Sequence, residues 1–92
     1  MFSKSDFNQI DRKYFKVLTT TCFHIILQSK STHHIWDVYF KQSDYGKSLV
    51  VYHKHSEDAP FHEQSGMHPR SILEAQELIR EHDAWHLDGR RT

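Results

Sequence analysis

The sequence has no excess of either charge and no long apolar run. Its 12 basic and 12 acidic residues cancel, so the chain lacks the net positive field that supplies most non-specific affinity for nucleic acids and anionic lipids. No segment approaches the run of about 18 apolar residues that spans a membrane, and residues 1–10 lack the apolar core of a signal peptide. These absences predict a cytoplasmic protein with no membrane partner and no nucleic-acid partner.

Cysteine is equally scarce, because Cys22 is the only one. It has no partner for an intramolecular disulfide, which fits a reducing compartment and suggests a small core residue. A chain of 92 residues buries enough surface for one core and not for two. Because 37% of the residues are hydrophobic, which is enough for a compact core, we expect residues 1–92 to form a single domain.

Three segments alternate apolar and polar residues, as strands with one buried face do. They span residues 22–28, 33–41 and 49–55. Before the third segment, Gly46 suits the left-handed position of a three-residue hairpin loop, which pairs Ser43 with Lys47. A two-residue loop in the first hairpin pairs Ser29 with Thr32. The sequence therefore predicts a three-stranded antiparallel meander.

These two registers place the large apolar side chains on one face. That face holds Phe23, Ile25, Leu27, Trp36, Val38, Phe40, Val50 and Tyr52. On the opposite face, Asp37 is expected between His24 and His53, in one row across three strands. Directly opposed Cβ atoms are about 4.5 to 5.5 Å apart, so the carboxylate would hydrogen-bond to both imidazoles and raise their pKa values.

Two helices are predicted to flank the meander. Ser71 and Glu74 form a capping box before a helix over about residues 72–85, and its apolar stripe would cover the apolar sheet face. That stripe consists of Ile72, Ala75, Leu78, Ile79 and His82 or Trp85. At the amino end, apolar residues from Phe7 to Leu18 recur at helical spacing behind Ser5 or Asp6. A strand over residues 14–18 is the alternative, since Tyr, Phe and Val favour strands.

With residues 56–70 as a long loop, the expected fold class is α+β: a three-stranded antiparallel meander packed against a C-terminal helix, in the order αβββα. This order resembles that of double-stranded RNA-binding domains. Their second helix opens with a lysine-rich run that faces phosphates, whereas residues 69–74 here hold one cation and one acid. The resemblance therefore implies the fold alone, and RNA binding is not carried over to this chain.

The nine histidines are the unusual feature of the composition. His82 and His86 have the spacing of paired zinc ligands, but the glutamate of the metalloprotease signature is missing, because Asp83 follows His82. They are expected to be ordinary helix-end histidines, and no metal or cofactor is predicted. His53 and His55 suit acid-base cleavage of RNA, although no basic patch accompanies them.

We therefore expect a small non-enzymatic domain that binds another protein, with self-association left open. The second sheet face carries apolar residues around the row, which suggests that a helix or a partner covers it. The predicted protein-binding residues are His24, Ile35, Asp37, Tyr39, His53 and His55. The alternative is a histidine-dependent enzyme, either metal-assisted or an acid-base ribonuclease, that uses four of them: His24, Asp37, His53 and His55.

Overall fold

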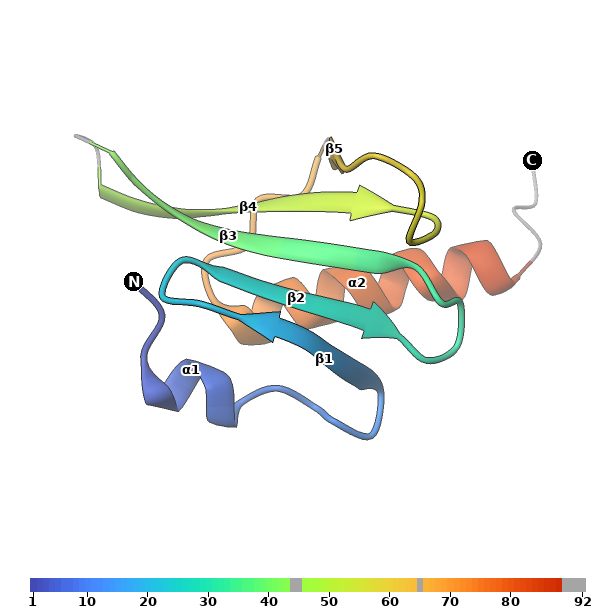
Figure 1. Cartoon of the computed structure of the whole chain (residues 1–92), viewed down its shortest axis with the longest axis horizontal. Coiled ribbons are helices and arrows are strands. Elements are labelled where there is room, and N and C mark those ends of the chain that lie inside the picture. The colour runs from blue at the N-terminus through green and yellow to red at the C-terminus, as the bar shows by residue number, and fades with distance from the viewer. Residues whose placement is uncertain (44–45, 65, 89–92) are drawn as a thin grey trace.

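A computed structural model describes residues 1–43, 46–64 and 66–88, and it contains a five-stranded antiparallel sheet with a long helix on one face (Figure 1). The elements are α1 (Lys4–Asn8), β1 (Phe15–Thr20), β2 (His24–Ser29), β3 (Ile35–Ser43), β4 (Gly46–Lys54), β5 (His62–Glu63) and α2 (Ile72–Leu87). The strands lie in the order β1-β2-β3-β4-β5. The α+β class is confirmed, and the predicted meander gains a strand on each side. Neither described helix is long and apolar enough to cross a membrane.

The predicted amino-terminal helix is mostly wrong, and the alternative strand is what the chain forms. Helix α1 is only five residues long. Ser3 caps it, where Ser5 or Asp6 was expected, and Ser3 and Asp6 form a reciprocal capping box. Residues 15–20 instead pair with β2 as an edge strand. The strand buries Phe15 and satisfies its backbone groups in the sheet, which outweighs a weak helical spacing.

The register of β3 and β4 differs by one residue from the prediction. Ser43 pairs with Gly46 instead of Lys47, so two residues connect the strands; those residues, 44 and 45, lie outside the described part of the chain. A one-residue change moves every side chain of a strand to the other face. His53 therefore lies opposite Trp36 and is only 2% exposed, whereas Asp37 lies opposite Tyr52.

The register of β2 and β3 differs by two residues, which leaves the faces unchanged. Trp36 lies opposite Leu27 instead of Ile25, and His24 lies opposite Tyr39 instead of Asp37. The cause is a longer connection, because the N–H of Ser29 donates to the carbonyl of His34 and not to that of Thr32. His33 within this connection has a positive φ of 65°.

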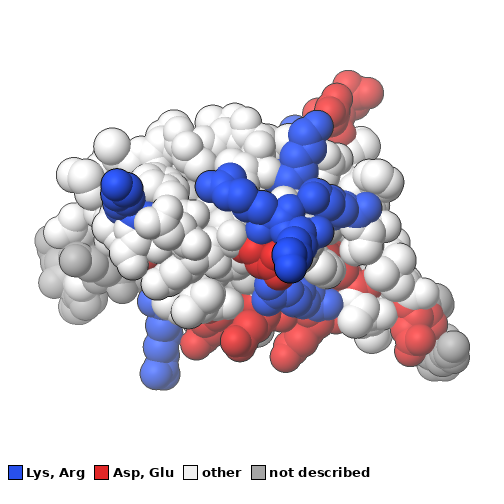
Figure 2. Space-filling model, turned by 90° about the horizontal axis from the view of Figure 1, so that it is seen from below, with Lys and Arg blue, Asp and Glu red and all other residues white. Residues whose placement is uncertain are grey.

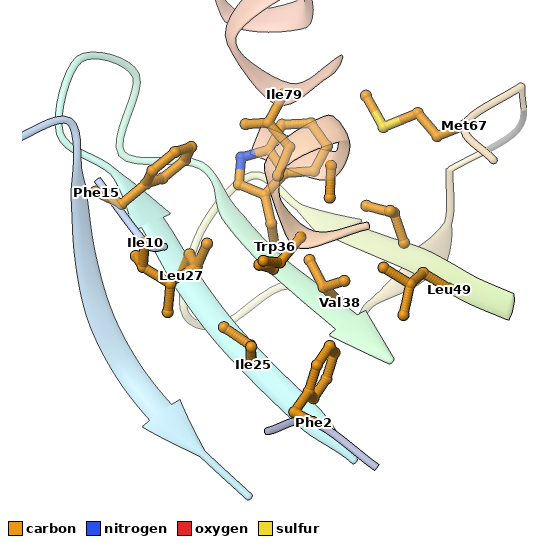
Figure 3. Close-up of a cluster of buried hydrophobic side chains, with 13 residues drawn as sticks. Phe2, Ile10, Phe15, Ile25, Leu27, Trp36, Val38, Leu49, Met67 and Ile79 are labelled. Atoms are coloured by element: carbon orange, nitrogen blue, oxygen red, sulfur yellow. The ribbon is translucent and has the colours of Figure 1, made fainter. Parts of the chain in front are cut away.

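The hydrophobic core lies between the inner sheet face and α2 (Figure 3). It comprises Phe2, Ile10, Phe15, Ile25, Leu27, Trp36, Val38, Leu49, Val51, Met67, Ile72, Ala75 and Ile79. Trp36 is fully buried, and its Nε1 donates to Ser29 Oγ at 3.1 Å. Two predicted core residues are instead at the surface, because Cys22 is exposed and Phe23 is 45% exposed.

Helix α2 begins where its cap predicts and continues two residues beyond the expected end. The N–H of Glu74 donates to Ser71 Oγ at 3.1 Å, as a capping serine requires. The Glu74 carboxylate accepts from the N–H of Arg70, one residue before the cap. The buried face of α2 includes Gln76 and Asp83 besides apolar residues, so polar groups contribute to its docking on the sheet.

Candidate metal centre

Six of the nine histidines gather at one end of the core, between the inner sheet face and the second half of α2. They are His34 ahead of β3, His53 in β4, His55 just after β4, His62 in β5, and His82 and His86 in α2. The ring centroids of His34 and His53 are 4.9 Å apart, and those of His34 and His86 are 4.7 Å apart. The His53 ring also lies 5.3 Å from His62 and 5.2 Å from His82. We call these six residues the histidine cluster.

His34 is the centre of the histidine cluster, because both of its ring nitrogens are hydrogen-bonded. Its Nδ1 lies 3.0 Å from His53 Nε2, and its Nε2 lies 3.3 Å from His55 Nδ1. His53 and His34 are 2% and 5% exposed, whereas His55 is at the surface. The three imidazoles therefore form a hydrogen-bonded chain from the core to solvent.

The two buried imidazoles are neutral at physiological pH. Burial lowers the pKa of His53 to about 3, and His34 and the other neighbouring histidines lower it in the same direction. Burial also lowers the pKa of His34 to about 4, assisted by His55 and His86, while the charge of Asp83 acts in the opposite direction. Neutral imidazole is the form that binds metal ions, since the ligand must offer a lone pair.

The nitrogens of His34, His53 and His55 lie close enough together to share one metal ion. One nitrogen from each ring lies within 4.8 Å of the other two. Ligands that sit about 2.0 to 2.1 Å from a tetrahedral zinc ion are about 3.4 Å from one another, so ligation requires only modest movement. All-imidazole sites suit zinc, copper and nickel.

A second group of three potential ligands contains His34, His82 and Asp83. Its carboxylate is already engaged, because Tyr14 Oη donates to Asp83 at 2.6 Å and Thr32 Oγ1 donates at 3.1 Å. These bonds satisfy a carboxylate that is 0% exposed. The three-imidazole group is therefore the better metal site, and Asp83 provides negative charge beside it.

The predicted row of His24, Asp37 and His53 is only half present. His24 Nδ1 lies 3.0 Å from both carboxylate oxygens of Asp37, on the face away from α2. His53 lies on the inner face because the register of β4 is shifted. Of the six residues predicted to bind protein, four lie on the outer side of the sheet: His24, Ile35, Asp37 and Tyr39. The other two, His53 and His55, belong to the histidine cluster. Protein binding by them stays a prediction.

The histidine cluster was not predicted from the sequence, although several of its members were singled out there. The spacing of His82 and His86 was a signal, and so was the alternation of His53 and His55 along one strand. What joins them is the register of β4, which turns His53 toward the helix. His34 and His62 carried no local signal of their own.

None of the known family models, curated proteins or solved structures matches this chain, so its function has to be inferred from its own geometry.

Proposed function

We propose that this protein binds one divalent transition-metal ion through His34, His53 and His55, with zinc as the first candidate. The observation that carries the proposal is the convergence of three imidazole nitrogens within 4.8 Å. They come from the residue before β3, the penultimate residue of β4 and the residue that follows β4. Strand pairing between β3 and β4 sets the positions of these backbones before any metal arrives.

The lowered pKa values favour metal ligation over acid-base catalysis near neutral pH. A general acid or base works best when its pKa lies near the working pH, whereas the pKa values of His34 and His53 are about 4 and about 3. Such rings are poor proton carriers at pH 7 but offer their lone pairs continuously. This supports the metal-assisted alternative over the acid-base ribonuclease.

The fourth coordination position distinguishes a structural site from a catalytic one. Three protein ligands with an open position are typical of catalytic zinc, and four protein ligands are typical of structural zinc. Two further imidazoles adjoin the site, because the ring centroid of His86 lies 4.7 Å from that of His34 and the ring centroid of His82 lies 5.2 Å from that of His53. His82→Ala and His86→Ala variants therefore separate the two: a closed site loses affinity in one of them, and an open site keeps it in both.

Zinc titration by calorimetry tests the proposal directly. The intact chain is expected to bind one zinc ion at neutral pH. His55→Ala is the most informative variant, because His55 is exposed and its removal leaves the core intact. Its dissociation constant should rise more than about 10-fold, since even outer-shell partners of a metal contribute that much. The matched control is His68→Ala, which removes an exposed histidine outside the histidine cluster and should leave binding unchanged.

Two results would refute metal binding at this site. One is the absence of binding by the wild-type chain when zinc, cobalt, nickel and copper are each tested. The other is an equal loss of affinity in His55→Ala and His68→Ala, which would assign the binding to scattered surface histidines.

A further inference from the structure

Neither described helix covers the outer face of the sheet, and α2 packs against the opposite face (Figure 1). Partly exposed aromatic rings lie on it. The ring of His24 stacks on that of Tyr39 with centroids 4.7 Å apart and planes inclined by 22°. Tyr52 on β4 lies diagonally from Tyr39, since Tyr39 pairs with Val50. The face therefore presents a stacked aromatic pair with a second tyrosine beside it.

Basic residues gather along the β1 margin of this face. Arg12, Lys13, Lys16 and Lys30 are all exposed there. Lys16 lies opposite Gln28 across the strand pair, and Lys30 Nζ donates to the carbonyl of Arg12 at 2.8 Å. We call these four residues the basic margin. Figure 2 shows Lys and Arg gathered on this side of the molecule.

Asp11 borders the basic margin, where it is paired with Arg80 at 2.9 Å, and most of the other acidic residues lie elsewhere. Helix α2 and its cap hold Glu74, Glu77, Glu81, Asp83 and Asp88. In Figure 2 many of the Asp and Glu atoms lie below the Lys and Arg atoms, while others lie among them and at the upper right. Asp37 is the only acid in strands β1 to β4, and it is 9% exposed and hydrogen-bonded to His24. Although the net charge is zero, basic residues predominate at the β1 margin and acidic residues predominate on α2.

We propose that single-stranded nucleic acid binds across the outer face of β1 to β3. Its bases would stack on the His24–Tyr39 pair, and its phosphates would contact the basic margin. Exposed aromatic rings beside a cationic groove or margin are the general means of holding unpaired strands, because every base has a stacking face. Glu63 faces Tyr52 at the far side of the sheet, so the strand would run from Tyr39 toward β1.

This inference is independent of the metal site, which lies on the opposite face of the sheet. It differs from the expectation, drawn from the zero net charge and from the single cation in residues 69–74, that nucleic acid is not a partner. A protein partner fits less well, since the centres of protein interfaces are depleted of charged residues, and four cations border this aromatic pair. The local distribution of charge, and not its sum, decides which polymer is attracted.

Fluorescence anisotropy with a labelled uridine oligonucleotide of about 12 nucleotides, in the presence of EDTA, tests the proposal. The wild-type chain should bind, and four phosphate contacts predict that affinity falls about 50-fold between about 50 mM and 200 mM salt. Tyr39→Ala should weaken binding about 5- to 150-fold through loss of stacking. A DNA or RNA duplex of equal length should bind more weakly, since its bases are not free to stack.

Charge-reversal variants locate the contact. Lys16→Glu should weaken binding at low salt, and Lys4→Glu, which makes the same change in net charge at an exposed position of α1, should have little effect. Circular dichroism establishes that each variant is folded, and Lys16→Glu, at an exposed position, tests the surface even if Tyr39→Ala does not fold. The proposal is overturned if the wild-type chain does not bind at low salt, if the duplex binds as tightly, or if Lys4→Glu and Lys16→Glu behave alike.

Discussion

Acidification should destabilise the metal-free protein through its two buried imidazoles. The pKa of His34 is lowered from 6.5 to about 4, and that of His53 from 6.5 to about 3, chiefly because both rings are buried. Below pH 6.5 the unfolded chain therefore binds more protons at these positions than the folded chain. Stability is fully present above the unfolded pKa and falls as the pH is lowered toward the folded values.

The size of the effect follows from these values. At about pH 5 both rings are still neutral in the folded chain, so repulsion between two charged rings does not contribute. In the unfolded chain each histidine is mostly protonated, because this pH lies about 1.5 units below its pKa. Each ring then lowers the free energy of unfolding by roughly 2 kcal/mol relative to about pH 7.5. Together they remove roughly 4 kcal/mol from a total stability expected near 5 to 15 kcal/mol.

Urea unfolding at the two pH values, in EDTA, measures this difference. A His53→Gln variant should show a pH dependence smaller by roughly 2 kcal/mol, because one of the two buried imidazoles is gone. His68→Gln, at an exposed position outside the histidine cluster, should retain the full dependence. If the wild type and His53→Gln lose equal stability between the two pH values, the assignment of neutral buried rings is wrong.

Two further substitutions, each compared with a second variant, test the packing around the histidine cluster. Trp36→Ala should cost about 3 to 5 kcal/mol in urea unfolding through the cavity it leaves. Asp37→Asn should cost about 1 to 2 kcal/mol, because it removes the charge from a 9% exposed group that is hydrogen-bonded to His24. Equal losses would contradict the assigned faces of β3. Tyr14→Phe should cost about 2 kcal/mol in thermal unfolding, because the buried Asp83 carboxylate loses a donor at 2.6 Å. Tyr52→Phe on the outer face should change little, and a similar loss there would contradict the role of the Asp83 bond.

Local chemistry was enough to predict several parts of the fold. Ser71 with Glu74 fixed the start of α2, because capping groups satisfy backbone donors wherever the helix later packs. Alternating apolar residues revealed the strands of the meander, and the inward orientation of Trp36 is as predicted. The strand β5 was not predictable, since its two residues, His62 and Glu63, offer no pattern and acquire order from pairing with β4.

The candidate site depends on the register between β3 and β4, which the sequence pattern did not determine. Gly46 has a positive φ of 113°, as expected for a glycine at a hairpin, but it pairs with Ser43 instead of ending a three-residue loop. A glycine indicates a hairpin without fixing the length of its loop. The difference of one residue moves His53 from the outer face to the core, and this movement converts scattered histidines into the histidine cluster.

Two-dimensional NMR of the histidine ring nitrogens, recorded before and after addition of one equivalent of zinc, tests the metal site most directly. One nitrogen each of His34, His53 and His55 should shift to the position of a metal-bound imidazole, while His24, His33 and His68 stay unchanged. Ring nitrogens of His34 and His53 that are unaffected by zinc, or shifts confined to His24, His33 and His68, would contradict the proposed centre.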